Sequence, residues 1–163
     1  MKKLFTVLLT ALMVFACTAT VFAEGKTDPT TTTTDVTYTV AESFTWSIPA
    51  NITLTTKDAA EGGEVGFTAG GLCTAGDTYK ITYKAANGNL VSTTDSNVKL
   101  EYKVVIGTTD SVPATTATDV LEATAADINT GKKVAFKAKF TQAATQAGVY
   151  KDTVTFECAK KTS

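Results

Sequence analysis

The sequence of 163 residues contains no arginine and no histidine. Without arginine the chain lacks the planar, bidentate donor that proteins use for phosphate and guanine, and its 15 lysines are scattered along the chain. Nucleic acid is therefore not an expected partner. Without histidine, neither a Ser-His-Asp nor a Cys-His catalytic site can be built, and the commonest metal ligand is missing. We expect no catalytic residues, no cofactor and no metal site, and the chain is predicted not to be an enzyme.

Paired carboxylates are scarce as well. A glycosidase needs two carboxyl groups on either side of a sugar, and Asp152 is the one acid that the strand pattern places on an inward face. No partner for it is evident in the sequence. We therefore interpret Asp152 as a structural residue near a strand end, bonded to backbone groups.

Only one long apolar run is present, over residues 4–16, and it is too short for a membrane-spanning helix. Two lysines precede it and small residues follow, which predicts a signal peptide over residues 1–23 with cleavage between Ala23 and Glu24. A lipoprotein signal with Cys17 as the lipidated residue is the alternative. Removal of residues 1–23 takes away two lysines and no acid, so the net charge would change from −1 to −3 and no membrane span would remain.

Residues 24–35 are polar and contain Pro29 and an unbroken threonine run, so we expect a disordered spacer. Residues 36–160 then form one domain, long enough to bury a core. Cys73 and Cys158 are the two cysteines of the mature chain, and in an exported protein they predict a disulfide. Its loop of about 85 residues would contribute roughly 4 to 5 kcal/mol by the chain-entropy model. Two buried free thiols are the alternative.

Period-two alternation of apolar and polar residues is the main pattern of the domain, and it predicts β-strands. Asn87-Gly88 predicts a tight turn between two of them. Residues 119–129 fit either a short helix or a strand followed by a loop. The expected fold is all-β, an antiparallel immunoglobulin-like β-sandwich of roughly 7 to 9 strands. The strand pattern covers residues 36–40, 44–48, 51–55, 65–69, 79–84, 90–91, 98–106, 134–140 and 150–158.

The closing residues carry a family resemblance. Residues 147–150 and 153–156 resemble the Ala-Gly-Thr-Tyr and Thr-Val-Thr-Phe ending of many small exported bacterial sandwich domains. The ending is also similar to that of the WxL cell-wall-binding domain, in which a tyrosine is followed by tryptophan and then leucine. The corresponding residues here are Tyr150, Phe156 and Cys158. Residues 44–54 likewise resemble the opening of small secreted proteins of Firmicutes. The resemblance implies an extracellular sandwich on the cell envelope, and WxL domains attach non-covalently to peptidoglycan.

The sequence thus predicts a non-catalytic secreted or cell-surface protein that acts in envelope association, adhesion or assembly. Its expected partner is cell-wall polysaccharide or another surface protein. One alternative is a carbohydrate-binding module that contacts its ligand through Trp46 and Tyr150, although the phase of Trp46 favours core packing. Another alternative is a pilin-like or coat-like subunit that polymerises by strand exchange.

Overall fold

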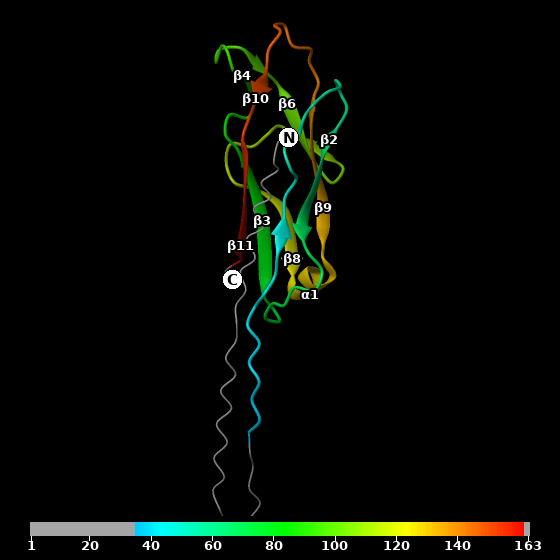
Figure 1. The fold of residues 1–163 in the computed structure, drawn as a ribbon, viewed down its shortest axis with the longest axis vertical. Helices are drawn as coiled ribbons and strands as arrows, with labels where there is room; N and C mark the ends of the chain where they lie inside the picture. The colour runs from blue at the N-terminus through cyan, green and yellow to red at the C-terminus, as the bar shows by residue number, and fades with distance from the viewer. Residues whose placement is uncertain (1–34, 162–163) are drawn as a thin grey trace, which may run out of the picture. The chain divides into compact units, whose positions relative to one another are not determined.

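A computed structural model describes residues 35–161 of the chain (Figure 1). The predicted signal peptide, its cleavage site at Ala23 and Glu24, the alternative lipidation site Cys17 and nearly all of the predicted spacer lie outside the described residues. Contacts divide the chain into two units, Met1–Thr37 and Tyr38–Ser163. The second unit contains every helix and strand described below.

Residues 35–161 form eleven β-strands and one short helix, and every strand pair is antiparallel. The prediction of an all-β antiparallel sandwich is confirmed. The strand count exceeds the expected range because strands are divided where they change sheets. The elements are β1 (Trp46–Ser47), β2 (Glu61–Phe67), β3 (Thr78–Ala85), β4 (Leu90–Ser92), β5 (Lys99–Leu100), β6 (Tyr102–Ile106), β7 (Thr109–Ser111), β8 (Thr118–Thr124), α1 (Ala125–Thr130), β9 (Lys133–Phe140), β10 (Tyr150–Lys151) and β11 (Val154–Lys160).

Two sheets enclose the core. One has the strand order β1-β2-β9-β6-β7 and the other has the order β11-β3-β8, while β10, β4 and β5 form a third, small sheet. Alternate residues of the facing strands point inward, as period-two patterning requires. Phe136 of β9 lies between the two layers, with ring centroids 5.3 Å from Tyr83 and 4.8 Å from Phe156, both in edge-to-face geometry. These aromatic contacts join the two layers across the core.

Two predicted strands each divide between two sheets. The closing strand, predicted as continuous over residues 150–158, pairs first with β4 as β10 and then with β3 as β11. The strand predicted over residues 98–106 pairs with β4 as β5 and, after Glu101, with β9 and β7 as β6. Alternation continues across both breaks because it depends on local geometry, whereas the hydrogen-bonding partner changes. Strands that change sheets form the corners of a sandwich.

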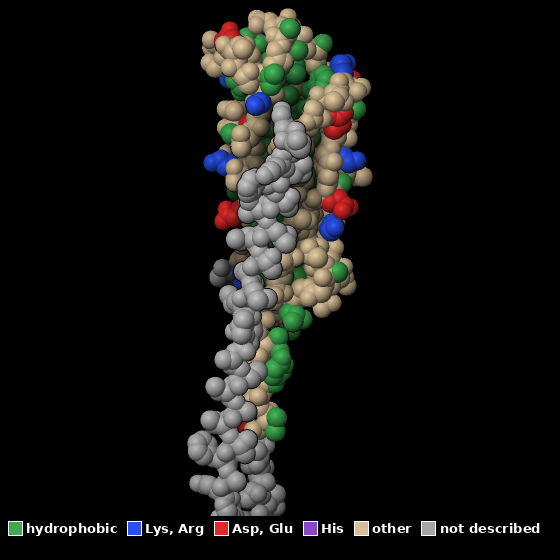
Figure 2. Space-filling view, viewed as in Figure 1, with side chains coloured by type: hydrophobic (Ala, Val, Ile, Leu, Met, Phe, Trp, Pro, Cys, Tyr) green, Lys and Arg blue, Asp and Glu red, His purple; other side chains and the backbone are tan. Residues whose placement is uncertain are grey.

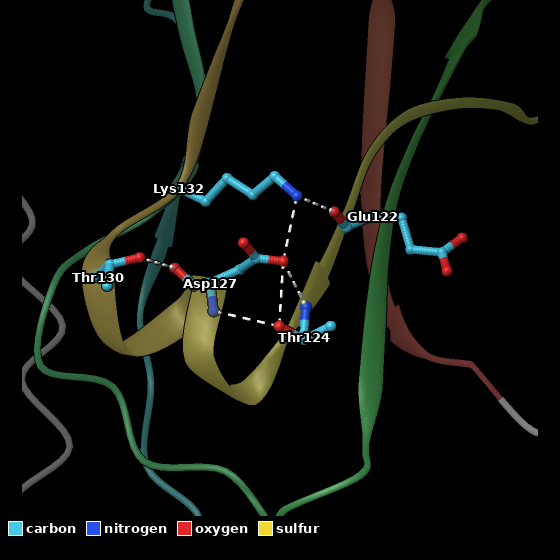
Figure 3. Close-up of polar contacts among 5 residues, drawn as sticks. All are labelled: Glu122, Thr124, Asp127, Thr130 and Lys132. Atoms are coloured by element: carbon cyan, nitrogen blue, oxygen red, sulfur yellow. Dashed lines mark hydrogen bonds and ion pairs between the residues drawn. The ribbon is translucent and has the colours of Figure 1, made fainter.

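The ambiguous residues 119–129 contain both predicted elements in succession. Strand β8 ends at Thr124, which is the N-cap of α1, and the Thr124 hydroxyl accepts a hydrogen bond from the Asp127 backbone at 3.3 Å (Figure 3). Asp127 accepts in return from the Thr124 backbone at 3.0 Å, which completes a capping box. Gly131 ends the helix with a left-handed φ of 78°. No helix within residues 35–161 is long and apolar enough to cross a membrane.

Two predicted strands are absent from the structure, and one observed strand was not predicted. Residues 36–40 and 51–55 belong to no strand, although both alternate, because no neighbouring strand pairs with them within the described residues. Conversely, β7 lies outside every predicted strand range and pairs with β6. The chain bends at Asn87-Gly88, and Gly88 has the left-handed φ of 69° that a tight turn favours. The strands on either side do not pair with each other as predicted, because β3 pairs with β11 and β8 whereas β4 pairs with β10 and β5.

Candidate functional site

The chain enters the sandwich at a polar corner that we call the entry corner, formed by Glu42, Cys73, Thr74, Asp77, Tyr79 and Lys160. The Glu42 carboxylate accepts hydrogen bonds from the Tyr79 hydroxyl at 2.7 Å and from the Thr74 backbone N–H at 3.0 Å. The first bond, followed by those from Thr74, lowers the pKa of Glu42 from 4.5 to about 2. Burial and the bond to Glu42 raise the pKa of Tyr79, so its hydroxyl stays a donor. The corner therefore fastens the incoming segment to β3 and to the loop before it.

The second carboxylate of the entry corner lies on the loop that precedes β3. Lys160, at the end of β11, forms an ion pair with Asp77, and its ammonium group also lies 3.9 Å from Glu42. The bond to Asp77 raises the pKa of Lys160. One ammonium thus balances two carboxylates contributed by different segments, and the end of the closing strand is tied to the start of the domain.

Both predicted disulfide residues lie at this corner. Cys73 and Cys158 are half-buried free thiols that pack against the core. Burial raises the pKa of each thiol; the charge of Glu42 adds to the effect at Cys73, and the proximity of Cys73 adds to it at Cys158. A raised pKa keeps the thiols protonated at neutral pH and makes them weak nucleophiles. The two cysteines lie near enough for Cys73 to influence the pKa of Cys158, but they are not bonded in the structure, and the disulfide stays a prediction.

Apolar side chains stand exposed on the segment that leads into the entry corner. This entry segment, residues 36–40, alternates Val36, Tyr38 and Val40 with two threonines, and the three apolar side chains are 94%, 82% and 56% exposed. Figure 2 shows hydrophobic side chains along the segment that precedes the sandwich. Single exposed apolar residues are ordinary, but three at alternate positions of one five-residue segment indicate a contact surface.

A second polar cluster surrounds Asp152, between β10 and β11. Its carboxylate accepts hydrogen bonds from the backbone of Asn87, Gly88 and Thr153 at 3.0, 3.0 and 2.8 Å, and from the Asn87 side chain at 3.2 Å. The Tyr102 hydroxyl donates a fifth bond at 3.0 Å. Burial and this bond raise the pKa of Tyr102. The interpretation of Asp152 as a structural acid that bonds backbone groups is confirmed.

The two predicted ligand-contact aromatics lie in different sheets. Trp46 of β1 is half-buried against the core and lies opposite Phe67 in the ladder. Tyr150 of β10 is half-buried, and its hydroxyl donates to the Gln146 carbonyl at 2.8 Å. The exposed tyrosine is Tyr38. The structure therefore does not bring Trp46 and Tyr150 together on one strand pair, and the aromatic side chain most open to a partner belongs to the entry segment.

A shallow hollow of about 440 Å³ lies over the outward face of β3 and β11. Its lining includes Thr82, Lys84, Thr155 and Glu157, and it has a single carboxyl group, that of Glu157. This hollow does not provide the pair of carboxylates that glycoside hydrolysis needs. Within residues 35–161 no three histidine, cysteine or acidic side chains gather in a way that would hold a metal ion.

Sequence reasoning identified the two cysteines and Asp152 but not their surroundings. Glu42 and Tyr79 are 37 residues apart, and Tyr102 and Asp152 are 50 apart. The alternation of the sequence places Tyr79 and Tyr102 on the inward side of their strands and so predicts that both are buried. It does not predict which carboxylate each hydroxyl contacts. The sequence matches no protein-family model and no curated protein.

Proposed function

We propose that this chain is a non-catalytic, exported β-sandwich protein that acts at the cell surface through envelope association, adhesion or assembly. The observation that carries the proposal is the entry segment, where the alternating residues Val36, Tyr38 and Val40 are exposed immediately before the sandwich begins. A protein exported into water keeps such a surface when a partner covers it. The predicted signal peptide over residues 1–23 supports the export.

The polar groups of the sandwich support the same view. The carboxylates of Glu42 and Asp152 each accept several hydrogen bonds from the fold itself, and Asp77 is paired with Lys160. These acids hold segments together across long sequence distances. The resemblance of the closing residues to the wall-binding WxL ending favours peptidoglycan or another envelope component as the surface to which the protein is held.

The test is fractionation of cells that secrete the tagged full chain into cytoplasm, membrane, purified wall and medium. We expect the chain in the wall fraction, and we expect Tyr38→Ser/Val40→Ser to move it to the medium, because retention depends on the contact that these side chains make, either with the envelope itself or with another copy of the chain. The matched control is Thr37→Ser/Thr39→Ser, which changes the opposite face of the same segment and should leave the distribution unaltered. Complete recovery of the unmodified chain in the medium would reject envelope association.

A further inference from the structure

Strand β11 has one edge without a partner among the described residues. It is the outermost strand of the order β11-β3-β8 and pairs only with β3. The Lys161 N–H donates to the Thr78 carbonyl, and the Ala86 N–H donates to the Thr153 carbonyl. The odd-numbered residues of this strand therefore direct their backbone N–H and C=O groups toward β3. Backbone groups alternate in direction along an antiparallel strand. Val154, Phe156, Cys158 and Lys160 therefore direct their N–H and C=O groups to the free edge.

The free edge of β11 is apolar on its inward side. Val154, Phe156 and Cys158 are half-buried and pack against the core. No charge interrupts this inward row before Lys160. Natural edge strands are often protected by an inward-pointing charge, a proline or a bulge. β11 has no proline, and its ladder with β3 shows no register shift, so the edge can accept another strand.

The entry segment has the composition and length of such a strand. Val36, Tyr38 and Val40 alternate with threonines, and five residues extend about 17 Å, the same span as residues 154–158. The segment pairs with no strand within the described residues. A strand added at the free edge would place its apolar side chains beside the inward-facing side chains of β11. It would add backbone hydrogen bonds to the sheet and bury more of the core.

The occupant that fits is the entry segment of a second copy. For the segment to return to its own β11, the chain would have to reverse at Ala41-Glu42, directly before the bridge between Ser43 and Leu72. The two-residue turns that best join two paired strands have positive φ at one or both residues, and neither Ala41 nor Glu42 has it. Glu42 is also held by Tyr79 and Thr74. We infer that this protein self-assembles head to tail, the residue 36–40 segment of one copy adding as a strand to the free edge of β11 in the next.

A donor segment and an acceptor edge on different parts of one chain form a heterologous contact, which closes into a ring or extends into a fibre. This inference rests on the proposed function and specifies its assembly. Sedimentation velocity of the full chain, purified after processing by the host, should show multimers that grow with concentration. Tyr38→Ser/Val40→Ser should raise the half-assembly concentration by about tenfold or more, because two side chains lose their buried surface. Thr37→Ser/Thr39→Ser should leave that concentration unchanged. At concentrations where the chain is monomeric, neither variant should shift the unfolding midpoint, because these side chains are exposed in the single chain.

Cross-linking tests the strand phase directly. In a Cys73→Ser background, Cys158 of the acceptor edge is the one remaining thiol of the predicted mature chain. Mild oxidation should join it to a cysteine introduced at residue 36, 38 or 40, strongest at one of the three, and much less to one introduced at residue 37 or 39. Monomers at all concentrations, or equal cross-linking in both phases, would overturn the inference. Monomers together with wall retention would reject the inference alone, whereas phase-specific multimers without wall retention would reject envelope association alone.

Discussion

Replacement of Asp152 by alanine should destabilise the sandwich by about 2 to 4 kcal/mol. The carboxylate accepts five hydrogen bonds, but the exposed donors on Asn87 and Thr153 can turn to water when it is removed. The buried Gly88 N–H and the Tyr102 hydroxyl, on a side chain that is 5% exposed, cannot do so. Each buried donor left without a partner costs about 1 to 3 kcal/mol, and the half-buried position of Asp152 favours the lower part of the range.

A double-mutant cycle isolates the bond between Tyr102 and Asp152. Tyr102→Phe alone should cost about 1 kcal/mol, because it removes one charge-assisted hydrogen bond. In the Asp152→Ala background the same change should be neutral or stabilising, because it removes an orphaned hydroxyl. The coupling energy should therefore be about 1 kcal/mol or more.

Urea unfolding followed by the fluorescence of Trp46, the single tryptophan, measures both effects. The matched control is Asp119→Ala. The Asp119 side chain is 65% exposed, and its carboxylate lies 2.9 Å from the Lys80 ammonium group. This surface pair should contribute at most about 1 kcal/mol. A loss below about 1 kcal/mol for Asp152→Ala, or additive effects in the cycle, would refute the assignment of Asp152 as the structural link between the Asn87-Gly88 turn and the core.

Three further predictions concern other parts of the fold. Gly66→Ala should destabilise by about 1 to 3 kcal/mol in urea unfolding, because its new Cβ would meet the β9 backbone at Lys133, with 2.6 Å to Cα, and a loss under about 0.5 kcal/mol would contradict this. The lowered pKa of Glu42 means that its stabilising contribution is present above about pH 4.5 and is lost as the pH falls toward 2. Glu42→Gln should therefore flatten the dependence of the free energy of unfolding on pH in this range. An unchanged dependence would contradict a stabilising role for the Glu42 carboxylate at the entry corner. Oxidation should join Cys73 to Cys158 and raise the unfolding midpoint of the wild type but not of Cys73→Ser, whereas two thiols that stay titratable after oxidation would support the free-thiol alternative.

The sequence by itself determined which stretches alternate and where the chain turns. Alternation needs only the extended backbone and the contrast between apolar and polar side chains, so β3 and β9 follow from their residues. Asn87-Gly88 likewise determined a turn, because Gly88 adopts positive φ without a steric penalty. The two alternatives for residues 119–129 were each half correct, because strand and helix propensities there are close and the Thr124 cap separates them.

Only the tertiary structure decided which alternating stretches become strands. Residues 36–40 alternate as cleanly as β11, yet β11 forms a ladder with β3 and residues 36–40 form none within the described residues. A strand needs a neighbour to satisfy its backbone groups, and that neighbour is chosen by contacts between distant parts of the chain. Tyr102 and Asp152 are likewise far apart in the chain, so the sequence indicated that both side chains face inward but not that they would meet.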